Sequence, residues 1–202
     1  MPTNTYRAAL APSLLSGRSS AVQELILVLA GTAVLYISGK ISVPFYPVPM
    51  TLQTLAVMAI AAAYGMRLGT LTVLAYLAEG AVGIPVFTAT PPAIAGLTYF
   101  LGPTGGFLAG FIPLAVIVGY AADRGWDRSP VRLFGAMLVA DVVLFALGFL
   151  WLALFAHVGQ HTGLGFASAF KNGVVPFVLG DLLKIALASA LVPAVWGLVG
   201  KR

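Results

Sequence analysis

The sequence predicts an all-α membrane protein with six transmembrane helices and both termini in the cytoplasm. Of its 202 residues, 60% are hydrophobic and only 8% are charged, whereas a soluble domain carries roughly 25% charged residues. The mean hydropathy of +1.00 agrees. This composition excludes a globular cytosolic enzyme, a disordered regulator and a nucleic-acid binder. The length accommodates about six spans of roughly 20 residues within a single integral membrane domain, residues 1–202.

Six apolar stretches define the predicted spans. The first stretch follows residues 1–20, which lack the continuous apolar core of a signal peptide and are expected to form a short cytoplasmic tail. Each stretch ends where turn residues collect. We place the spans at residues 22–41, 50–66, 68–86, 104–122, 131–156 and 174–199.

The five connections differ in their turn chemistry. Prolines at positions 44, 47 and 49 crowd the first connection, and glycines at both ends make residues 65–69 a tight second turn. The third connection, residues 86–103, is long and rich in proline and glycine. The fourth, residues 123–130, is charged and ends at Pro130. The fifth, residues 157–173, is expected to be a loop.

Lysine and arginine are distributed unequally between the two predicted sides of the membrane. One side has only Lys40 and Lys171, whereas the tails and the second and fourth connections hold eight basic residues. Because cytoplasmic loops are enriched in Lys and Arg, these segments are predicted to be cytoplasmic, and the third and fifth connections face outward. The eight residues are Arg7, Arg18, Arg67, Arg124, Arg128, Arg132, Lys201 and Arg202.

Four charged residues fall inside predicted spans: Glu79, Asp141, Asp181 and Lys184. A charge at the centre of a transmembrane helix costs about 2.5–3.5 kcal/mol on insertion scales, so such groups usually face the bundle interior and have a partner. Asp181 and Lys184 are three residues apart and share a helix face. The pair either neutralises itself and ties helices together or lines a polar pocket open to the outside, and we favour the pocket.

Depth suggests which of these charges meet. Asp181 is expected about seven residues, or roughly 10 Å, below the outer end of the sixth span. Glu79 is expected at a similar depth in the third span, so three ionisable groups converge in the outer half of the bilayer. A structural role for Glu79 is an equal alternative. Asp141 is expected near the midplane, where it pairs with Lys184 or is protonated and bonded to a helix carbonyl.

The chain offers no catalytic constellation. It has no cysteine, no Walker motif, no Gly-x-Ser-x-Gly and no His-Glu-x-x-His. His157 and His161 have the spacing of a metal pair but no evident third ligand, so we interpret them as loop histidines. A compact helical bundle with a polar site facing outward is typical of a binding or transport protein. We therefore expect no enzyme activity, no metal and no cofactor.

Four motifs together carry a resemblance to a known family. They are residues 48–55 (VPMTLQTL), 76–87 (YLAEGAVGIPVF), 101–107 (LGPTGGF) and 176–184 (PFVLGDLLK). In this order and spacing they resemble the BioY family, the biotin-specific substrate-binding (S) component of energy-coupling factor (ECF) transporters. The resemblance covers about residues 42–191. It implies a six-helix, multi-pass protein of the inner or plasma membrane that captures biotin from outside.

The resemblance also implies a binding site. The family's biotin-binding Asp and Lys fall on Asp181 and Lys184, and a polar family position falls on Glu79. Acceptors and a donor of this kind suit the two N–H groups and the carbonyl of biotin's ureido ring. The remaining predicted site residues lie in the motifs or are expected as apolar walls: Gln53, Phe87, Tyr99, Gly102, Thr104 and Phe177. The biotin carboxylate is expected nearest the outer water, where Lys171 or backbone N–H groups assist, and loop 86–103 closes over the site.

The resemblance finally implies partners. Most members work with a transmembrane scaffold protein and two cytoplasmic ATPases, so ATP is used only by those subunits. Ala30, Gly31 and Ala33 lie on the first span, but it has no strict Ala-xxx-Ala docking face. The alternative is a self-sufficient transporter of biotin or another vitamin, driven by protons through Asp141 or Glu79. No nucleic-acid partner is expected, and homo-oligomerisation stays open.

Overall fold

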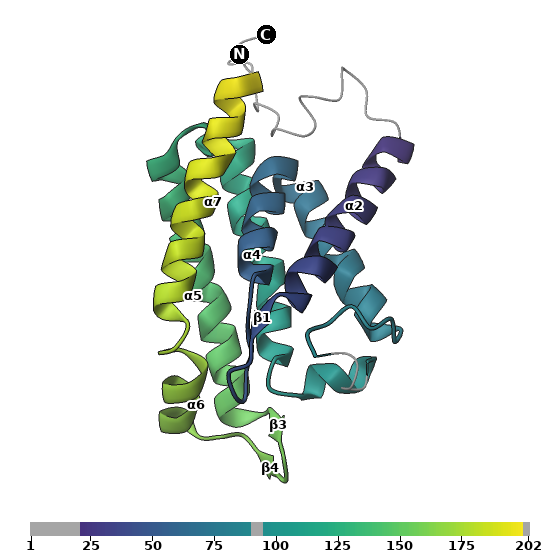
Figure 1. Ribbon diagram of the computed structural model, residues 1–202, viewed down its shortest axis with the longest axis vertical. Coiled ribbons are helices and arrows are strands. Elements are labelled where there is room, and N and C mark those ends of the chain that lie inside the picture. Colours follow the sequence, from purple (N-terminus) through teal and green to yellow (C-terminus); the bar gives the residue numbers. More distant parts are fainter. Residues whose placement is uncertain (1–20, 90–94, 200–202) are drawn as a thin grey trace, which may run out of the picture.

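The computed structural model describes residues 21–89 and 95–199, which form a bundle of long helices (Figure 1). Short hairpins and 3₁₀ turns join the helices at the two ends of the bundle. In chain order the elements are α2 (Ala21–Lys40), β1 (Ser42–Val43), β2 (Met50–Thr51), α3 (Gln53–Ala81), the 3₁₀ helix η1 (Leu97–Leu101), α4 (Gly105–Asp123), η2 (Trp126–Arg128), α5 (Pro130–Leu154), β3 (His157–Val158), β4 (His161–Thr162), α6 (Phe166–Gly173) and α7 (Val178–Val199).

Five helices among the described residues are long and apolar enough to cross a membrane, namely α2, α3, α4, α5 and α7. This confirms the predicted all-α membrane class. The count differs from the six predicted spans because the spans expected at 50–66 and 68–86 both fall within α3. The predicted tail at 1–20, Pro91 and Pro92 lie outside the described residues.

Helix α3 folds back on itself at Gly65. This residue has φ 80° and ψ 177°, which no helical residue adopts, and the positive φ favours glycine. Gln53 Nε2 donates to Tyr76 Oη at 2.5 Å, although 23 residues of straight helix would separate the two by roughly 35 Å. Gly69 also packs against Ala61, where an added Cβ would lie 2.9 Å from the Ala61 Cα. The predicted tight turn at 65–69 is therefore present, inside a single assigned helix.

Two predicted boundaries are wrong by several residues, and one predicted loop contains regular structure. The third span ends at Ala81 rather than 86, because Gly83 has φ 99° and Pro85 follows it. The sixth span begins at Val178 rather than 174, two residues after Pro176. The fifth connection is not a plain loop: it contains the β3–β4 hairpin, in which His157 pairs with Thr162, and the eight-residue helix α6.

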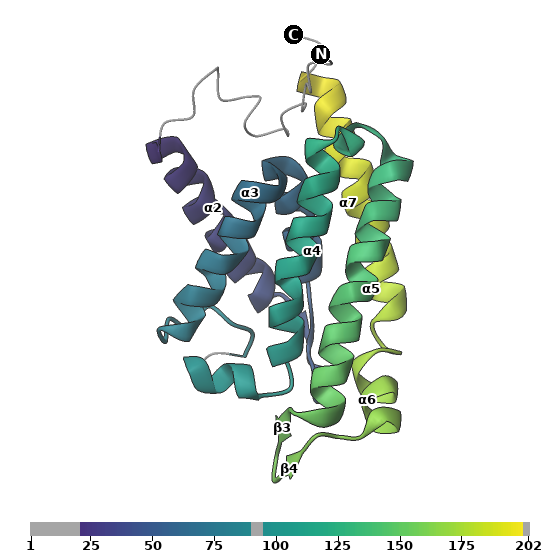
Figure 2. The ribbon, with the colours of Figure 1, turned by 180° about the vertical axis from the view of Figure 1, so that it is seen from behind.

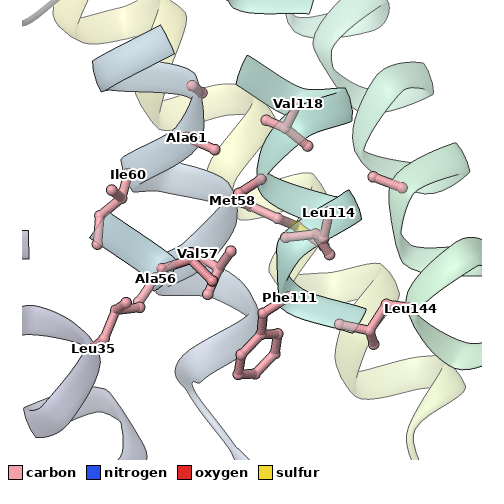
Figure 3. Packing of buried hydrophobic residues seen from close by; sticks show 14 of the residues in the cluster. Leu35, Ala56, Val57, Met58, Ile60, Ala61, Phe111, Leu114, Val118 and Leu144 are labelled. Carbon is pink, nitrogen blue, oxygen red and sulfur yellow. The ribbon is translucent and has the colours of Figure 1, made fainter. Parts of the chain in front are cut away.

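Helix α4 lies between α3 and α5, as Figure 2 shows from behind. Its Leu114 and Val118 are fully buried and belong to one apolar cluster with Met58 of α3 and Leu144 of α5 (Figure 3). Lipid tails are as apolar as these side chains, so close packing rather than escape from water holds such helices together.

Glycines on α4 permit this close approach. A Cβ at Gly106 would lie 2.2 Å from the Trp151 Cβ, and one at Gly110 would lie 3.1 Å from the Leu144 Cα. Gly106 and Gly110 thus form a small-residue packing face on α4. Gly102, four residues before Gly106, precedes α4 and belongs to the turn after η1.

Candidate functional site

A cavity of about 60 Å³ lies where the β2–α3 junction, α4, α5 and the start of α7 meet. This is the end of the bundle that carries α6 and the two hairpins (Figure 1). Its wall combines one buried ion pair with hydroxyls, an amide and many aromatic rings. The lining residues are Val48, Pro49, Thr51, Gln53, Thr54, Phe87, Thr88, Tyr99, Thr104, Phe107, Leu108, Phe111, Leu144, Phe145, Phe177, Asp181 and Lys184.

The ion pair joins Asp181 and Lys184 on the first turns of α7. Lys184 Nζ donates to Asp181 Oδ1 at 2.6 Å, and the two residues are only 8% and 2% exposed, respectively. Thr54 of α3 lines the same cavity as the Asp181 carboxylate. Spacing of three residues places both charges on one helix face, as the sequence predicted. A buried pair of this kind can offer an acceptor and a donor to a polar ligand.

Aromatic rings from the 82–104 connection form one wall. Phe87 is 1% exposed, and its ring stacks on Tyr99 with centroids 4.8 Å apart and meets Phe100 edge to face at 5.3 Å. Gly80 makes room for this ring, because a Cβ there would lie 2.0 Å from Phe87 Cζ. Burial raises the pKa of the Tyr99 phenol, which therefore stays an O–H donor at neutral pH.

A chain of hydrogen bonds fixes the same segment over the cavity. Tyr76 Oη donates to the carbonyl of Val86 at 3.1 Å, and Tyr99 Oη donates to the carbonyl of Thr88 at 2.7 Å. Thr88 Oγ1 in turn donates to the Gly39 carbonyl at 3.0 Å. Lys40 Nζ donates to the carbonyls of Pro85 and Phe87 at 3.0 and 2.8 Å. The end of α2 thus holds residues 85–88 in place.

Further parts of the wall are built by Phe177 and by the turn that precedes α4. Phe177 is 5% exposed and packs against Phe45, Phe107 and Phe145 at centroid distances of 6.1–6.5 Å. Trp151 Nε1 donates to the Gly102 carbonyl at 2.9 Å and so ties the turn to α5. Thr104, within this turn, lines the cavity together with Tyr99.

The structure brings seven of the nine predicted site residues to this cavity: Gln53, Phe87, Tyr99, Thr104, Phe177, Asp181 and Lys184. The other two lie elsewhere. Gly102 lines a neighbouring surface pocket with Pro103 and Thr98. Glu79 lines a separate pocket with Thr32 and Tyr36 of α2. The expected convergence of three ionisable groups is therefore wrong for Glu79.

Glu79 lies outside the cavity because it stands on a different face of α3 from the residues that contact the cavity wall. Tyr76 and Gly80 lie one turn apart and face the segment that closes the cavity. Glu79 precedes Gly80, so it is rotated by about 100° to another face. Because α3 ends at Ala81, Glu79 also lies closer to the helix end than the predicted boundary implied.

Several lining residues were missed by sequence reasoning. Phe107 and Phe111 stand one turn apart at the start of α4, a spacing that marks a shared face and was available in the sequence. Thr54 directly follows Gln53 and carried no separate signal. Thr88 and Phe145 reach the cavity through chain folding over long sequence distances, which no local pattern reports.

Asp141 lies near the ion pair without lining the cavity. It is 7% exposed on α5, one turn before Leu144, and interacts electrostatically with both Asp181 and Lys184. Its Oδ1 has no hydrogen-bond partner in the described part of the chain. We expected Asp141 either to pair directly with Lys184 or to bond to a helix carbonyl. Among the described residues, its Oδ1 makes neither contact.

The histidines agree with their interpretation as loop residues. His157 and His161 are exposed and lie on opposite strands of the β3–β4 hairpin. Within residues 21–89 and 95–199, no group of three His, Cys, Asp or Glu side chains is placed to hold a metal ion.

Apolar helices that enclose one buried acid, one buried amine and a ring of aromatic side chains define a membrane protein built to bind a small molecule. Comparison of the sequence with protein families identifies this membrane protein more specifically. A profile of the BioY family matches residues 9–201, and the chain belongs to this family.

Relatives and a solved structure agree with this assignment. The chain is 36% identical to the probable biotin transporter BioY of Pyrococcus horikoshii over 166 residues, covering 82% of this chain and 91% of that protein. It is 36% identical to the biotin transporter BioY of Rhizobium etli over 183 residues, covering 86% and 92%. A crystal structure of the S-component for biotin from an ECF-type ABC transporter matches with a TM-score of 0.71 and 25% identity, over 88% of this chain and 94% of that one. The family consists of transporters, not enzymes.

Proposed function

We propose that this chain captures biotin in the Asp181–Lys184 cavity and is the substrate-binding membrane component of a vitamin uptake transporter. The observation that carries the proposal is the buried ion pair inside an aromatic cavity. Burial of two charges is costly unless they serve each other or a ligand. Membership of the BioY family and the names of its relatives point to biotin as that ligand.

The chemistry of the cavity matches the ureido ring of biotin. Asp181 accepts from one ureido N–H, Lys184 donates to the ureido carbonyl, and the Gln53 side chain or the Thr54 hydroxyl offers a further polar contact. Each charge-assisted bond contributes about 1.5–3 kcal/mol. Phe87, Tyr99 and Phe177 contact the apolar ring and chain. Glu79 has no part in this arrangement, because it lines another pocket.

Entry of biotin requires the cavity to widen. A cavity of about 60 Å³ is well below the roughly 300–1,000 Å³ of pockets that hold small molecules, and biotin brings a bicyclic ring with a five-carbon acid chain. Residues 85–88 are the segment to move, since Lys40, Thr88 and Tyr99 hold them by hydrogen bonds rather than by helix structure. The biotin carboxylate then faces the outer water, on the side of α6 and Lys171.

We propose six membrane crossings with both termini in the cytoplasm. The fold-back at Gly65 gives α3 two antiparallel arms, so the five long helices supply six segments. The excess of basic residues at the Gly65 end of the bundle supports a cytoplasmic location for that end. Delivery of biotin to the inside then falls to an ATP-driven partner module of a scaffold protein and two ATPases, since the chain has no nucleotide-binding motif.

Proteoliposomes that hold this chain alone test the proposal. We expect the purified chain to bind labelled biotin at one molecule per chain, and the vesicles not to accumulate biotin until the partner module and ATP are added. Failure of the folded chain to bind biotin would contradict the capture function.

A second candidate, self-sufficient proton-driven transport, is favoured by one observation. Asp141 is a buried carboxyl group beside the ion pair, and its Oδ1 has no partner among the described residues. A group of this kind can exchange a proton as the ion pair rearranges. Biotin uptake by vesicles with this chain alone, driven by a proton gradient and lost in D141N, would favour this candidate over the first.

A further inference from the structure

An apolar groove of about 450 Å³ runs between α4 and α5, at the end of the bundle opposite the Asp181–Lys184 cavity. Its floor is made of small residues, and a Cβ built at Gly135 meets nothing within 4 Å. Two of its lining residues, Tyr120 and Trp126, are exposed aromatic side chains. The groove is lined by Ile117, Tyr120, Ala121, Arg124, Trp126, Gly135, Ala136 and Val139.

Each helix contributes one continuous stripe to the groove, and each stripe leads to an arginine. On α4 the stripe runs from Ile117 through Tyr120 and Ala121 to Arg124, just past the helix end, with steps of three or four residues. On α5 the same helix face runs from the exposed Arg132, which does not itself line the groove, to the lining residues Gly135, Ala136 and Val139 with the same steps. Residues at these spacings share a helix face. Arg124 therefore lines the groove at the end where η2 joins the two helices, and helix spacing puts Arg132 on the α5 face next to that end.

Within residues 21–89 and 95–199, no carboxylate forms an ion pair with either arginine. Asp123 Oδ2 accepts from the backbone N–H of Met66, on the α3 side of α4. Asp127 Oδ2 accepts from Trp196 Nε1 of α7, and Arg128 lies over the Trp196 ring at 4.2 Å. The Arg124 guanidinium stacks on Tyr120 at 4.4 Å, which uses its face and leaves its N–H edge available for an anion.

We propose that this groove binds an anionic diacyl phospholipid. One acyl chain lies along Ile117, Ala121, Gly135 and Val139, and the phosphate meets the arginines at the mouth. The groove opens on the lipid-facing side of two transmembrane helices, and Tyr120 and Trp126 are placed as interfacial aromatic residues. Basic pockets between transmembrane helices suit acidic headgroups, and an apolar groove alone would not distinguish them from neutral lipids.

Native mass spectrometry of the delipidated, purified chain tests this proposal. We titrate phosphatidylglycerol and phosphatidylcholine with identical acyl chains, and glycerol phosphate as a headgroup without chains. The variants are the double variant R124Q/R132Q and G135L, which fills the groove. Matched controls are R67Q, an exposed arginine near the same end paired with Glu24, and G197L, a helix glycine whose added Cβ also meets nothing within 4 Å.

We expect phosphatidylglycerol to bind at least fivefold more tightly than phosphatidylcholine, and glycerol phosphate not to bind. A charge near the membrane surface changes affinity about fivefold, so R124Q/R132Q lowers phosphatidylglycerol binding roughly 25-fold. G135L weakens both lipids, whereas R67Q and G197L stay within twofold of the parent chain. Equal binding of the two lipids, or a preference that survives R124Q/R132Q, would overturn the proposal, and this double variant decides it if G135L does not fold.

Discussion

Lys184 Nζ lies 2.6 Å from Asp181 Oδ1, one turn apart on α7, and both side chains are buried in the wall of the same cavity. Neither charge is compensated by solvent. A ligand that enters must therefore satisfy both partners at once, by accepting from the amine and donating to the carboxylate. A cyclic urea does so with neighbouring atoms, and this match underlies the predictions for the cavity.

Asp181→Asn removes the charge and one acceptor while it keeps the size of the side chain. We expect biotin affinity to fall at least tenfold, since a charge-assisted hydrogen bond contributes about 1.5–3 kcal/mol. Isothermal titration of biotin into the detergent-solubilised variant measures the loss. Arg67→Gln, which breaks an exposed ion pair with Glu24, is the control and should bind like the parent chain. An unchanged affinity in folded D181N would remove Asp181 from the site.

Glu79→Gln tests the placement of Glu79 outside the cavity. The residue lines a pocket with Thr32 and Tyr36, on a different face of α3 from Tyr76. We therefore expect the dissociation constant for biotin to change by less than about twofold, because a charge in another pocket contributes little to the bound ligand. The same titration measures it. A tenfold loss would show that Glu79 contacts the ligand after all.

Gly80→Ala tests whether the packing of the Phe87 ring requires a glycine at position 80. The added Cβ would overlap the Phe87 ring at 2.0 Å, so the ring must leave its packing against Tyr99 and Phe100. Such overpacking costs about 1–3 kcal/mol, and we expect a lower melting temperature together with weaker biotin binding. Gly197→Ala is the matched control, since its Cβ meets nothing within 4 Å and alanine favours a helix. Equal behaviour of the two variants would contradict the role given to Gly80.

The burial of Asp127 leads us to expect that the free energy of unfolding depends on pH. Burial raises the pKa of this carboxyl above its ordinary value of 3.8, although Trp196 and Arg128 oppose the shift. The folded chain then holds the proton more tightly than the unfolded chain. The free energy of unfolding therefore falls as the pH rises from the unfolded pKa through the folded one.

Thermal unfolding of the parent chain and of Asp127→Asn between about pH 4 and 8 measures this dependence. Asparagine keeps an acceptor for Trp196 but cannot ionise, so we expect the parent chain to lose stability relative to the variant as the pH rises. A constant difference, or a gain by the parent chain, would contradict the assignment.

Much of the site could be predicted because its chemistry is local in the sequence. Asp181 and Lys184 stand three residues apart in an apolar stretch, so their shared face follows from helix geometry. The prediction for Glu79 was wrong because it also relied on local sequence geometry. Its depth was measured from a helix end at 86, whereas Gly83 and Pro85 end α3 at Ala81, and depth alone says nothing about the face on which a residue lies.

The fold likewise has features that the sequence predicts and features that it does not. Composition and turn residues are enough to predict the apolar helices and the reversal near Gly65. The closure of the cavity by residues 85–88 depends on hydrogen bonds from Lys40, which is distant in the chain, and from Tyr76 and Tyr99, which lie outside this segment on either side. Such contacts leave no periodic signal. Helix α6 was missed because eight residues are too few to stand out from a loop.

Equilibrium binding of labelled biotin to the purified chain, with desthiobiotin, thiamine and riboflavin as competitors, tests the central claim most directly. Desthiobiotin keeps the ureido group that the Asp181–Lys184 pair is placed to bind. We predict tight binding of biotin that desthiobiotin displaces and that thiamine and riboflavin leave unchanged. A folded chain that does not bind biotin, or that releases it equally to all three competitors, would contradict the account.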